Sequence, residues 1–232
     1  MEPSLPLFPL TTALVPGLVL PLHIFEPRYR LMVEELLDKP EDEREFGIIG
    51  VRERRTHSAG TDAGPESHDD FYPVGVTAVV RQAERREDGR YDIVTIGARR
   101  FQVDDIDRSA PLLRASVTYL AEPDVDATDP RVQTLVTAAV EAFENYRAIL
   151  GGRLDEDRTD DEQVPTDPAV LSYLITAALV IDSATRQELL ASPDAINRLR
   201  IGIRILRSES ALISTLGAVP ALDLLNSTPS EN

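Results

Sequence analysis

The segment that most limits the fold of this chain is a nearly uncharged apolar run over residues 5–29, with the sequence LPLFPLTTALVPGLVLPLHIFEPRY. Prolines interrupt the run at positions 6, 9, 16, 21 and 27. Each interior proline would remove a helical hydrogen bond and clash with the preceding turn, so a membrane-spanning helix is not expected here. No lysine or arginine precedes Arg28, so the charged start of a secretory signal is missing as well. The run therefore predicts short buried strands.

The first half of the chain has the pattern of strands joined by turns. We expect strands over 5–10 and 18–22 around a Pro16–Gly17 turn, followed by a helix that begins at Pro27. Further strands are predicted over the ranges 46–51, 74–80, 91–96, 101–106 and 112–120. The Asp88–Gly89 pair predicts a tight hairpin turn. Five or more strands with hairpin connections predict a small antiparallel β barrel.

Helical periodicity replaces the strand pattern in the second half. Asp129–Pro130, Asp167–Pro168 and Ser192–Pro193 each place a capping side chain before a proline, which predicts three helix starts. A shorter helix is predicted over 185–191, with Ser183 as its cap. These patterns divide the chain into a β-rich domain over residues 1–122, an α-helical bundle over 123–225 and a disordered polar tail over 226–232. The predicted fold class is α+β.

Charge and residue usage argue against several kinds of function. The net charge is −16, from 40 acidic and 24 basic residues, and a field of that sign disfavours DNA, RNA and anionic membranes as partners. The chain has no cysteine, which excludes disulfides and thiolate metal ligands and fits a cytoplasmic location. Its single lysine, Lys39, lies in DKPED, which has neither the glycines of a P-loop nor the desolvated setting of a Ser–Lys protease dyad. We therefore expect no catalytic residue, no cofactor and no metal site.

Three stretches of the sequence resemble a known family. The opening contains PLFPL, VPG and LPLHIFEPRYR, residues 74–103 contain DGRY and G-x-R-R-F, and the helical end contains RQELL and NRLRIGIRIL. Together they resemble the Lon N-terminal domain, the substrate-binding domain of ATP-dependent protease La, over nearly the whole chain. The resemblance implies a PUA-like β pseudo-barrel with an early helix, followed by a helical bundle. It also implies a stand-alone bacterial protein without ATPase and protease domains, a non-enzymatic polypeptide-binding module in protein quality control.

Two short segments supply the candidate binding residues. The first is the strand-to-helix corner that contains His23, Phe25, Glu26, Arg28 and Tyr29, and the second is the pair Arg99 and Arg100. As a binding surface, the corner would place aromatic side chains beside a polar rim that orients a protein or peptide segment. The alternative is architectural: Glu26 caps the helix, an arginine pairs with a neighbouring acid, and His23 is satisfied by local hydrogen bonds.

Other functions stay open at this point. The main alternative is RNA or nucleotide binding, which PUA-like barrels often perform. RNA recognition needs a basic face with stacking aromatic side chains, and aromatic residues make up only 5% of this chain. A second alternative is a hydrolase that uses a pair of acidic residues. The sequence predicts neither the oligomeric state nor the identity of the partner.

Overall fold

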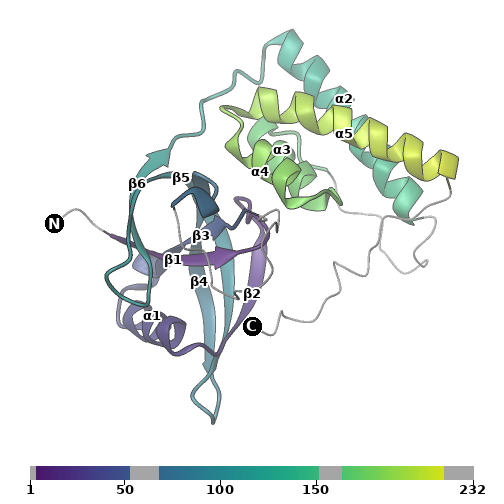
Figure 1. The fold of residues 1–232 in the computed structure, drawn as a ribbon. Coiled ribbons are helices and arrows are strands. Elements are labelled where there is room, and N and C mark those ends of the chain that lie inside the picture. Colours follow the sequence, from purple (N-terminus) through teal and green to yellow (C-terminus); the bar gives the residue numbers. More distant parts are fainter. Residues whose placement is uncertain (1–3, 53–67, 152–163, 217–232) are drawn as a thin grey trace. The chain divides into compact units, whose positions relative to one another are not determined.

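The computed structural model describes residues 4–52, 68–151 and 164–216 of the chain, so the predicted tail over 226–232 lies outside the described residues. The chain forms two compact units, which are coloured along the sequence in Figure 1. The first, called here the β unit, consists of Met1–Ala121 and Ser183–Leu190. The second, called the helical unit, consists of Glu122–Asp182 and Ala191–Asn232. The chain therefore passes between the two units three times.

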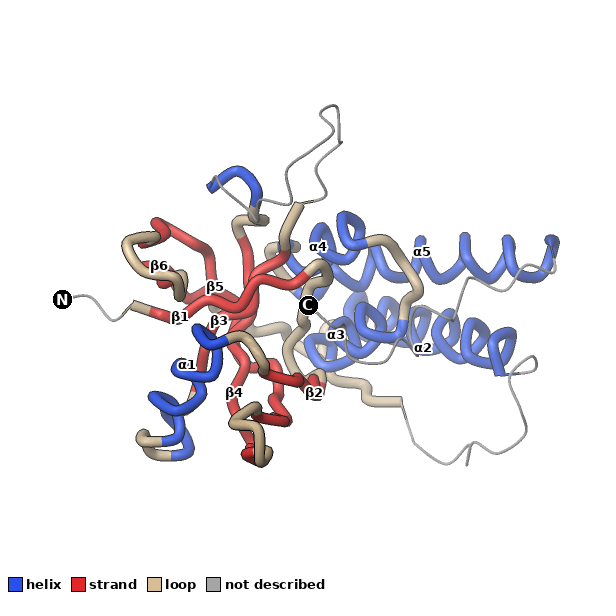
Figure 2. The backbone as a smooth tube through the Cα atoms, turned by 60° about the horizontal axis from the view of Figure 1, so that its bottom comes forward, coloured by secondary structure: helices blue, strands red, loops and turns tan. Residues whose placement is uncertain are grey.

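Six strands of the β unit form one mixed sheet that closes into a ring, drawn in red in Figure 2. Their bounds are β1 Leu5–Leu10, β2 Val19–Ile24, β3 Glu45–Gly50, β4 Val74–Arg85, β5 Tyr91–Asp107 and β6 Arg114–Leu120. The strand order is β2-β5-β4-β3-β1-β6, and β6 pairs again with β5. The prediction of a wholly antiparallel sheet is wrong for one pair, because β1 and β3 are parallel. The chain passes through β2 and a helix between these two strands, a connection long enough for a parallel return.

The ring closes because β5 is long enough to pair with different strands along its two parts. Its first part pairs with β2, and its last part, from Arg100 to Asp107, pairs with β6. The sequence predicts two strands here, over 91–96 and 101–106, whereas the structure joins them into one through Gly97. A β-carbon on Gly97 would lie 2.3 Å from the carbonyl oxygen of Val15. Glycine at this position therefore permits a close backbone approach and does not end the strand.

Phe101 fills the interior of the ring. Its side chain is fully buried, and it belongs to a cluster that also contains Leu5 and Leu7 of β1. A β-carbon on Gly47 would lie 2.9 Å from the Phe101 Cζ, and one on Gly75 would lie 2.4 Å from the same atom. The two glycines therefore make room for the aromatic ring, and a methyl group on either would force the core to rearrange.

Helix α1 (Pro27–Leu37) begins at the predicted proline. Its buried side chains, Tyr29, Met32, Val33 and Leu36, recur at the spacing of one helical face. The Tyr29 ring packs on Phe8 of β1, with the ring centroids 4.3 Å apart. This contact fixes the direction in which the chain leaves β2.

Helices α2 (Pro130–Gly151), α3 (Pro168–Ala178) and α5 (Ala195–Leu216) make up the core of the helical unit, and α5 packs against both of the others. Two predicted caps are confirmed, because the Asp129 carboxylate accepts a hydrogen bond from the Arg131 amide and the Asp167 carboxylate accepts one from the Val170 amide. The third prediction is wrong by two residues. Asp194, and not Ser192, caps α5 by accepting a hydrogen bond from the Asn197 amide at 2.7 Å.

Helix α4 (Ser183–Ala191) belongs to the β unit through residues Ser183–Leu190, although the helices on either side of it in the sequence belong to the helical unit. Its Gln187 side-chain amide donates to the Val74 carbonyl of β4 at 2.7 Å. The Ser183 hydroxyl donates to the Thr11 carbonyl at 2.7 Å, where the sequence predicts a helix cap. The β unit is therefore completed by a helix from the second half of the chain, which a division at residue 122 does not predict.

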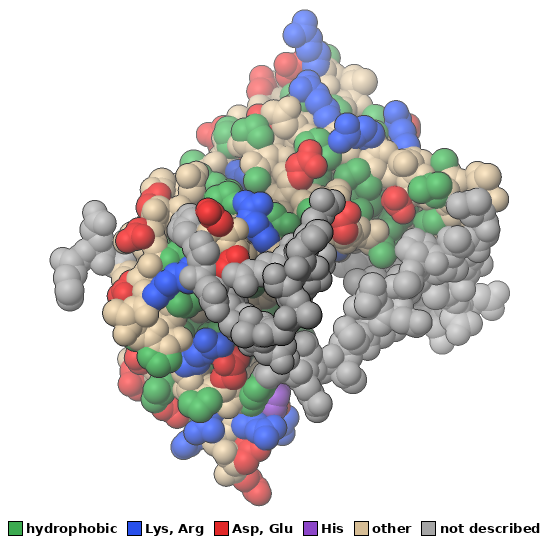
Figure 3. All heavy atoms as spheres, in the orientation of Figure 1, with side chains coloured by type: hydrophobic (Ala, Val, Ile, Leu, Met, Phe, Trp, Pro, Cys, Tyr) green, Lys and Arg blue, Asp and Glu red, His purple; other side chains and the backbone are tan. Residues whose placement is uncertain are grey.

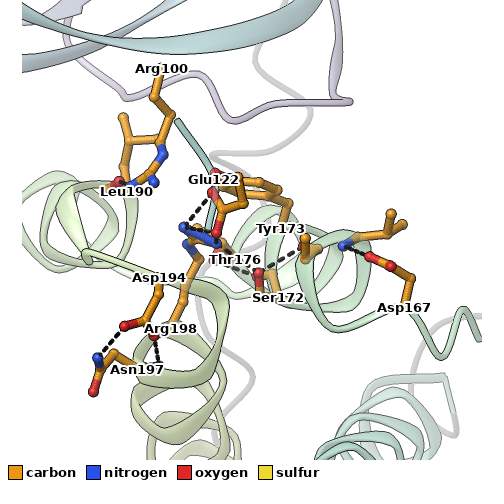
Figure 4. A network of polar contacts seen from close by, with 12 residues as sticks. Arg100, Glu122, Asp167, Ser172, Tyr173, Thr176, Leu190, Asp194, Asn197 and Arg198 are labelled. Atoms are coloured by element: carbon orange, nitrogen blue, oxygen red, sulfur yellow. Dashed lines mark hydrogen bonds and ion pairs between the residues drawn. The ribbon is translucent and has the colours of Figure 1, made fainter. Parts of the chain in front are cut away.

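A buried charge network joins three parts of the helical unit, as Figure 4 shows. Arg198 of α5 has a fully buried side chain and donates to both carboxylate oxygens of Glu122, at 3.1 and 3.2 Å. It also donates to the Ser172 hydroxyl of α3 at 2.9 Å. Tyr173 donates its hydroxyl to Glu122 at 2.5 Å, and its ring centroid lies 4.0 Å from the Arg198 guanidinium. Because Glu122 is the first residue of this unit, the network fixes how the chain enters it.

Candidate functional site

Strand β2 presents alternate side chains to the two faces of the sheet. Leu20, Leu22 and Ile24 lie opposite Thr95, Ile93 and Tyr91 of β5, respectively. The three β5 residues are all buried, so this face is part of the core. Val19, Pro21 and His23 therefore point to the other face. Val19 is 54% exposed, Pro21 is exposed and His23 is half-buried.

Strand β5 extends this second face. Val94 lies opposite Pro21 and Ile96 lies opposite Val19, and both β5 side chains are half-buried. Phe25 follows at the end of β2, where its ring stacks with that of His23 at a centroid distance of 6.3 Å. We call this surface the outer face; it consists of Val19, Pro21, His23, Phe25, Val94 and Ile96. It is mainly apolar and continuous along two strands.

The outer face lies at an edge of the sheet. Among the six described strands, β2 pairs only with β5 and stands at the end of the strand order. Pro21 has no backbone N–H, and proline on an edge strand weakens pairing with a further strand. The outer face is therefore better suited to contacts through side chains than to the addition of a strand.

One end of the outer face carries an ion-pair cluster. The His23 Nδ1 donates to the Asp92 carboxylate at 2.6 Å, and the Arg86 guanidinium pairs with the same carboxylate. These contacts, first the hydrogen bond from His23 and then that from Arg86, lower the pKa of Asp92. His23 therefore has a hydrogen-bond partner, as the architectural alternative expects, but that partner is Asp92 of β5 and not a local group. The cluster gives the apolar surface a charged boundary.

The predicted corner residues divide between surface and core. Glu26 occupies the N-cap position of α1 without a capping hydrogen bond, so the prediction that its side chain caps the helix is wrong. It pairs instead with Arg28 at 2.7 Å, because the arginine two residues later reaches its carboxylate. Tyr29 is buried, and burial together with Glu26 raises its pKa to about 12, against the opposing effect of Arg28. The Arg28 Nε is buried and has no hydrogen-bond partner among the described residues.

The second predicted pair, Arg99 and Arg100, is separated by the alternation of β5. Arg99 is exposed, pairs with Glu45 at 2.7 Å and stacks on the Tyr119 ring, with its Cζ 3.9 Å from the ring centroid. Arg100 is buried and donates to the Leu190 carbonyl of α4 at 3.0 Å. Arg99 therefore lies at the surface with Glu45 and Tyr119, whereas Arg100 holds α4 in the β unit.

Two members of the outer face, His23 and Phe25, are among the residues predicted from the sequence, and its other four members are not. The signal that could have found them is the continuous apolar character of LVLPL and the mainly apolar character of IVTI, which contains one threonine, in the two paired strands. A strand with one face in water normally alternates apolar and polar residues, so an unbroken run predicts that both faces are apolar. If the second face is not covered within the fold, it forms an exposed apolar surface.

The described residues place limits on other chemistry at this site. None of the described His, Asp and Glu side chains form a group of three or more that could hold a metal ion. No helix within the described ranges is both long and apolar enough to cross a membrane. The arrangement on the outer face, apolar side chains with a charged boundary, suits binding of an apolar segment.

Several longer proteins are similar to this chain. The chain is 27% identical over 213 residues to Lon protease 2 of Bdellovibrio bacteriovorus, an alignment that covers 91% of this chain and 25% of the relative. It is 24% identical over 211 residues to the Lon protease of Escherichia coli, covering 90% of this chain and 25% of that protein. The chain thus spans about a quarter of these relatives, and the protease and ATPase regions lie outside the alignments.

Solved structures show the same fold. The N-terminal domain of Mycobacterium avium complex Lon protease matches with a TM-score of 0.60 at 24% identity, covering 88% of this chain and 98% of that one. A Lon N-terminal domain protein from Xanthomonas campestris matches with a TM-score of 0.59 at 22% identity, covering 85% and 95% of the two chains. The model of the ATP-dependent protease La (LON) substrate-binding domain matches residues 4–208. The predicted resemblance is confirmed: this chain belongs to the ATP-dependent protease La (LON) substrate-binding domain family.

Proposed function

We propose that this protein binds exposed apolar segments of polypeptides through the outer face, without chemistry of its own, and that it contributes in this way to protein quality control. The observation that carries the proposal is the continuous apolar surface on the edge strand β2 and its neighbour β5. Membership of a substrate-binding domain family supports a polypeptide as the ligand.

The physical case rests on the free energy of burying this surface. Val19 is more than half exposed, and Pro21 beside it is exposed as well. Burying apolar area contributes roughly 25 cal/mol per Å² to the free energy of binding. An apolar ligand side chain that packs on these residues therefore binds more favourably than a polar one. The rigid aromatic ring of Phe25 adds contact area with little loss of conformational entropy.

The charged boundary gives the surface an orientation. Asp92 and Arg86 lie at the His23 end of the outer face, and Glu26 and Arg28 lie just beyond Phe25. Polar groups around an apolar centre are the usual anatomy of a protein interface. The ligand expected from this arrangement is an extended segment with apolar side chains and few charges.

The test compares two valines of equal exposure. Val19 on the outer face and Val170 on α3 of the helical unit are each 54% exposed. The probe is fluorescein-labelled, reduced and carboxymethylated α-lactalbumin, which stays unfolded, and the readout is fluorescence anisotropy with the full chain. Val19→Gln should weaken binding by about fivefold or more, whereas Val170→Gln should leave it unchanged.

Melting temperatures of both variants serve as the stability control, since exposed substitutions normally change stability little. Equal losses of affinity in the two variants would show that the site is not the outer face. Wild-type affinity for the probe in Val19→Gln would contradict the proposal directly.

A further inference from the structure

The exposed side of α5 carries a row of arginines. Arg200, Arg204 and Arg207 are spaced at i, i+4 and i+7, which places them on one side of a helix, and all three are exposed. The opposite sides of α5 pack against α2 and α3 within the helical unit. At a rise of about 1.5 Å per residue, the row extends over about 10 Å of the surface.

These three arginines have no acidic partner among the described residues, although the chain as a whole carries a net charge of −16. Glu209 is the single acidic residue of α5, and at about 100° per residue it lies far around the helix from the row. Arg198 on the same helix differs sharply, because it is buried and paired with Glu122. Within a Debye length of about 8 Å, like charges at this spacing repel one another, and an acidic ligand would relieve that repulsion.

An apolar strip runs beside the arginine row. Ile201 and Ile205 are half-buried, and Leu212 is 49% exposed, and on a helical wheel all three lie on the same flank of the row. Figure 3 shows basic side chains gathered over the helical unit along α5, with hydrophobic side chains between them. The surface therefore offers cations and apolar contact next to each other.

We propose that this α5 surface is a docking site for an acidic polypeptide segment that carries apolar residues between its carboxylates. Arginine suits this role because its planar guanidinium binds carboxylates through two parallel hydrogen bonds. The site lies on a different unit from the outer face and selects ligands of different chemistry, so it does not depend on the function proposed above.

A protein partner fits this surface better than a nucleic acid. Binding of single-stranded nucleic acid uses stacking aromatic side chains, but Phe143 and Tyr146 of the helical unit are buried. Tyr173 is engaged with Glu122 and Arg198.

The experiment uses the full chain and a fluorescein-labelled synthetic peptide built from Glu-Glu-Leu-Ala repeats. Anisotropy titration at about 50 mM salt should detect binding that weakens by about tenfold or more at about 300 mM salt, where the charges are screened. The triple variant Arg200→Gln, Arg204→Gln, Arg207→Gln should lose about tenfold in affinity, and the corresponding lysine variant should retain most of it.

A matched control removes the same charge elsewhere. Arg81, Arg85 and Arg90 are exposed arginines on the β4–β5 hairpin, and their replacement by glutamine gives the same net charge as the α5 variant. Unchanged binding in this control supports the α5 site, whereas an equal loss would overturn it by showing a general charge effect. The proposal also fails if a Gln-Gln-Leu-Ala peptide binds equally well, if a single-stranded oligonucleotide of the same charge binds more tightly, or if the acidic peptide does not bind at low salt.

Discussion

Removing Glu122 should destabilise the helical unit more than removing its partner, Arg198. The side chain of Arg198 has no exposed area, whereas that of Glu122 is 24% exposed. In Glu122→Ala the guanidinium loses the carboxylate of Glu122 but stays buried beside Ser172 and Tyr173. Removing one partner of a buried ion pair costs about 3–5 kcal/mol. We therefore expect Glu122→Ala to lower the unfolding free energy by that amount.

The reverse substitution leaves a different group behind. In Arg198→Met the remaining carboxylate is partly in contact with water and keeps the hydrogen bond from Tyr173 at 2.5 Å. The methionine also fills much of the space left by the arginine, so the loss should be only about 1–3 kcal/mol. In the double variant no buried cation remains, and its loss should be close to that of Arg198→Met alone. The two substitutions are therefore expected to be strongly non-additive.

Urea denaturation followed by far-UV circular dichroism measures these differences, because α2, α3 and α5 supply much of the helical signal. Glu141→Ala, an exposed acidic residue of α2, is the control and should change stability by less than about 0.5 kcal/mol. A loss of less than about 1 kcal/mol in Glu122→Ala, or a larger loss in Arg198→Met than in Glu122→Ala, would contradict the expected effect of the buried guanidinium.

Three further outcomes follow from the β unit. Arg100→Leu should lower the unfolding free energy by about 2–4 kcal/mol, because it removes the buried donor to the Leu190 carbonyl of α4. Arg99→Gln removes only an exposed ion pair and should lower it by under about 1 kcal/mol. Chemical denaturation measures both losses. In the same assay, Gly97→Ala should lower the unfolding free energy by about 1–3 kcal/mol, since its methyl group would meet the carbonyl oxygen of Val15. An unchanged denaturation midpoint would show that the backbone at Val15 can move. The pKa of Tyr29 is raised from 10.0 to about 12, so its contribution to stability is intact below pH 10 and is lost as the pH rises towards 12. Tyr29→Phe should therefore show a shallower loss of melting temperature over that range, and identical pH profiles would contradict the assignment.

Local patterns in the sequence were sufficient for most of the elements. The bounds of β1 and the start of α1 at Pro27 follow from proline positions and helical spacing. The turns at Gly17 and Gly89 follow from residue chemistry, and both glycines have positive φ angles, of 83° and 79°. These features depend on interactions within a few residues, so a reading of the chain can find them without knowledge of the fold.

The candidate site was only partly predictable, because it depends on contacts between segments that are far apart in the sequence. The motif around HIFEPRY pointed to His23 and Phe25, but whether an aromatic residue is exposed depends on what packs over it. Tyr29 lies four residues after Phe25 and is buried against Phe8, a contact made by a distant strand. Val94 and Ile96 join the site because the register of β2 with β5 places them opposite Pro21 and Val19, respectively.

By itself, the sequence determined the kinds of elements, the two-part α+β organisation and the family, because composition, periodicity and motif order are properties of the chain. The tertiary structure alone decided that Gly97 continues a strand, that β1 and β3 run parallel, and that α4 completes the β unit. It also decided which of two neighbouring arginines is buried, since Arg100 meets the end of α4 while Arg99 faces Glu45. Each of these outcomes depends on pairing and burial between segments far apart in the chain, where the free energy comes from contacts that no local pattern specifies.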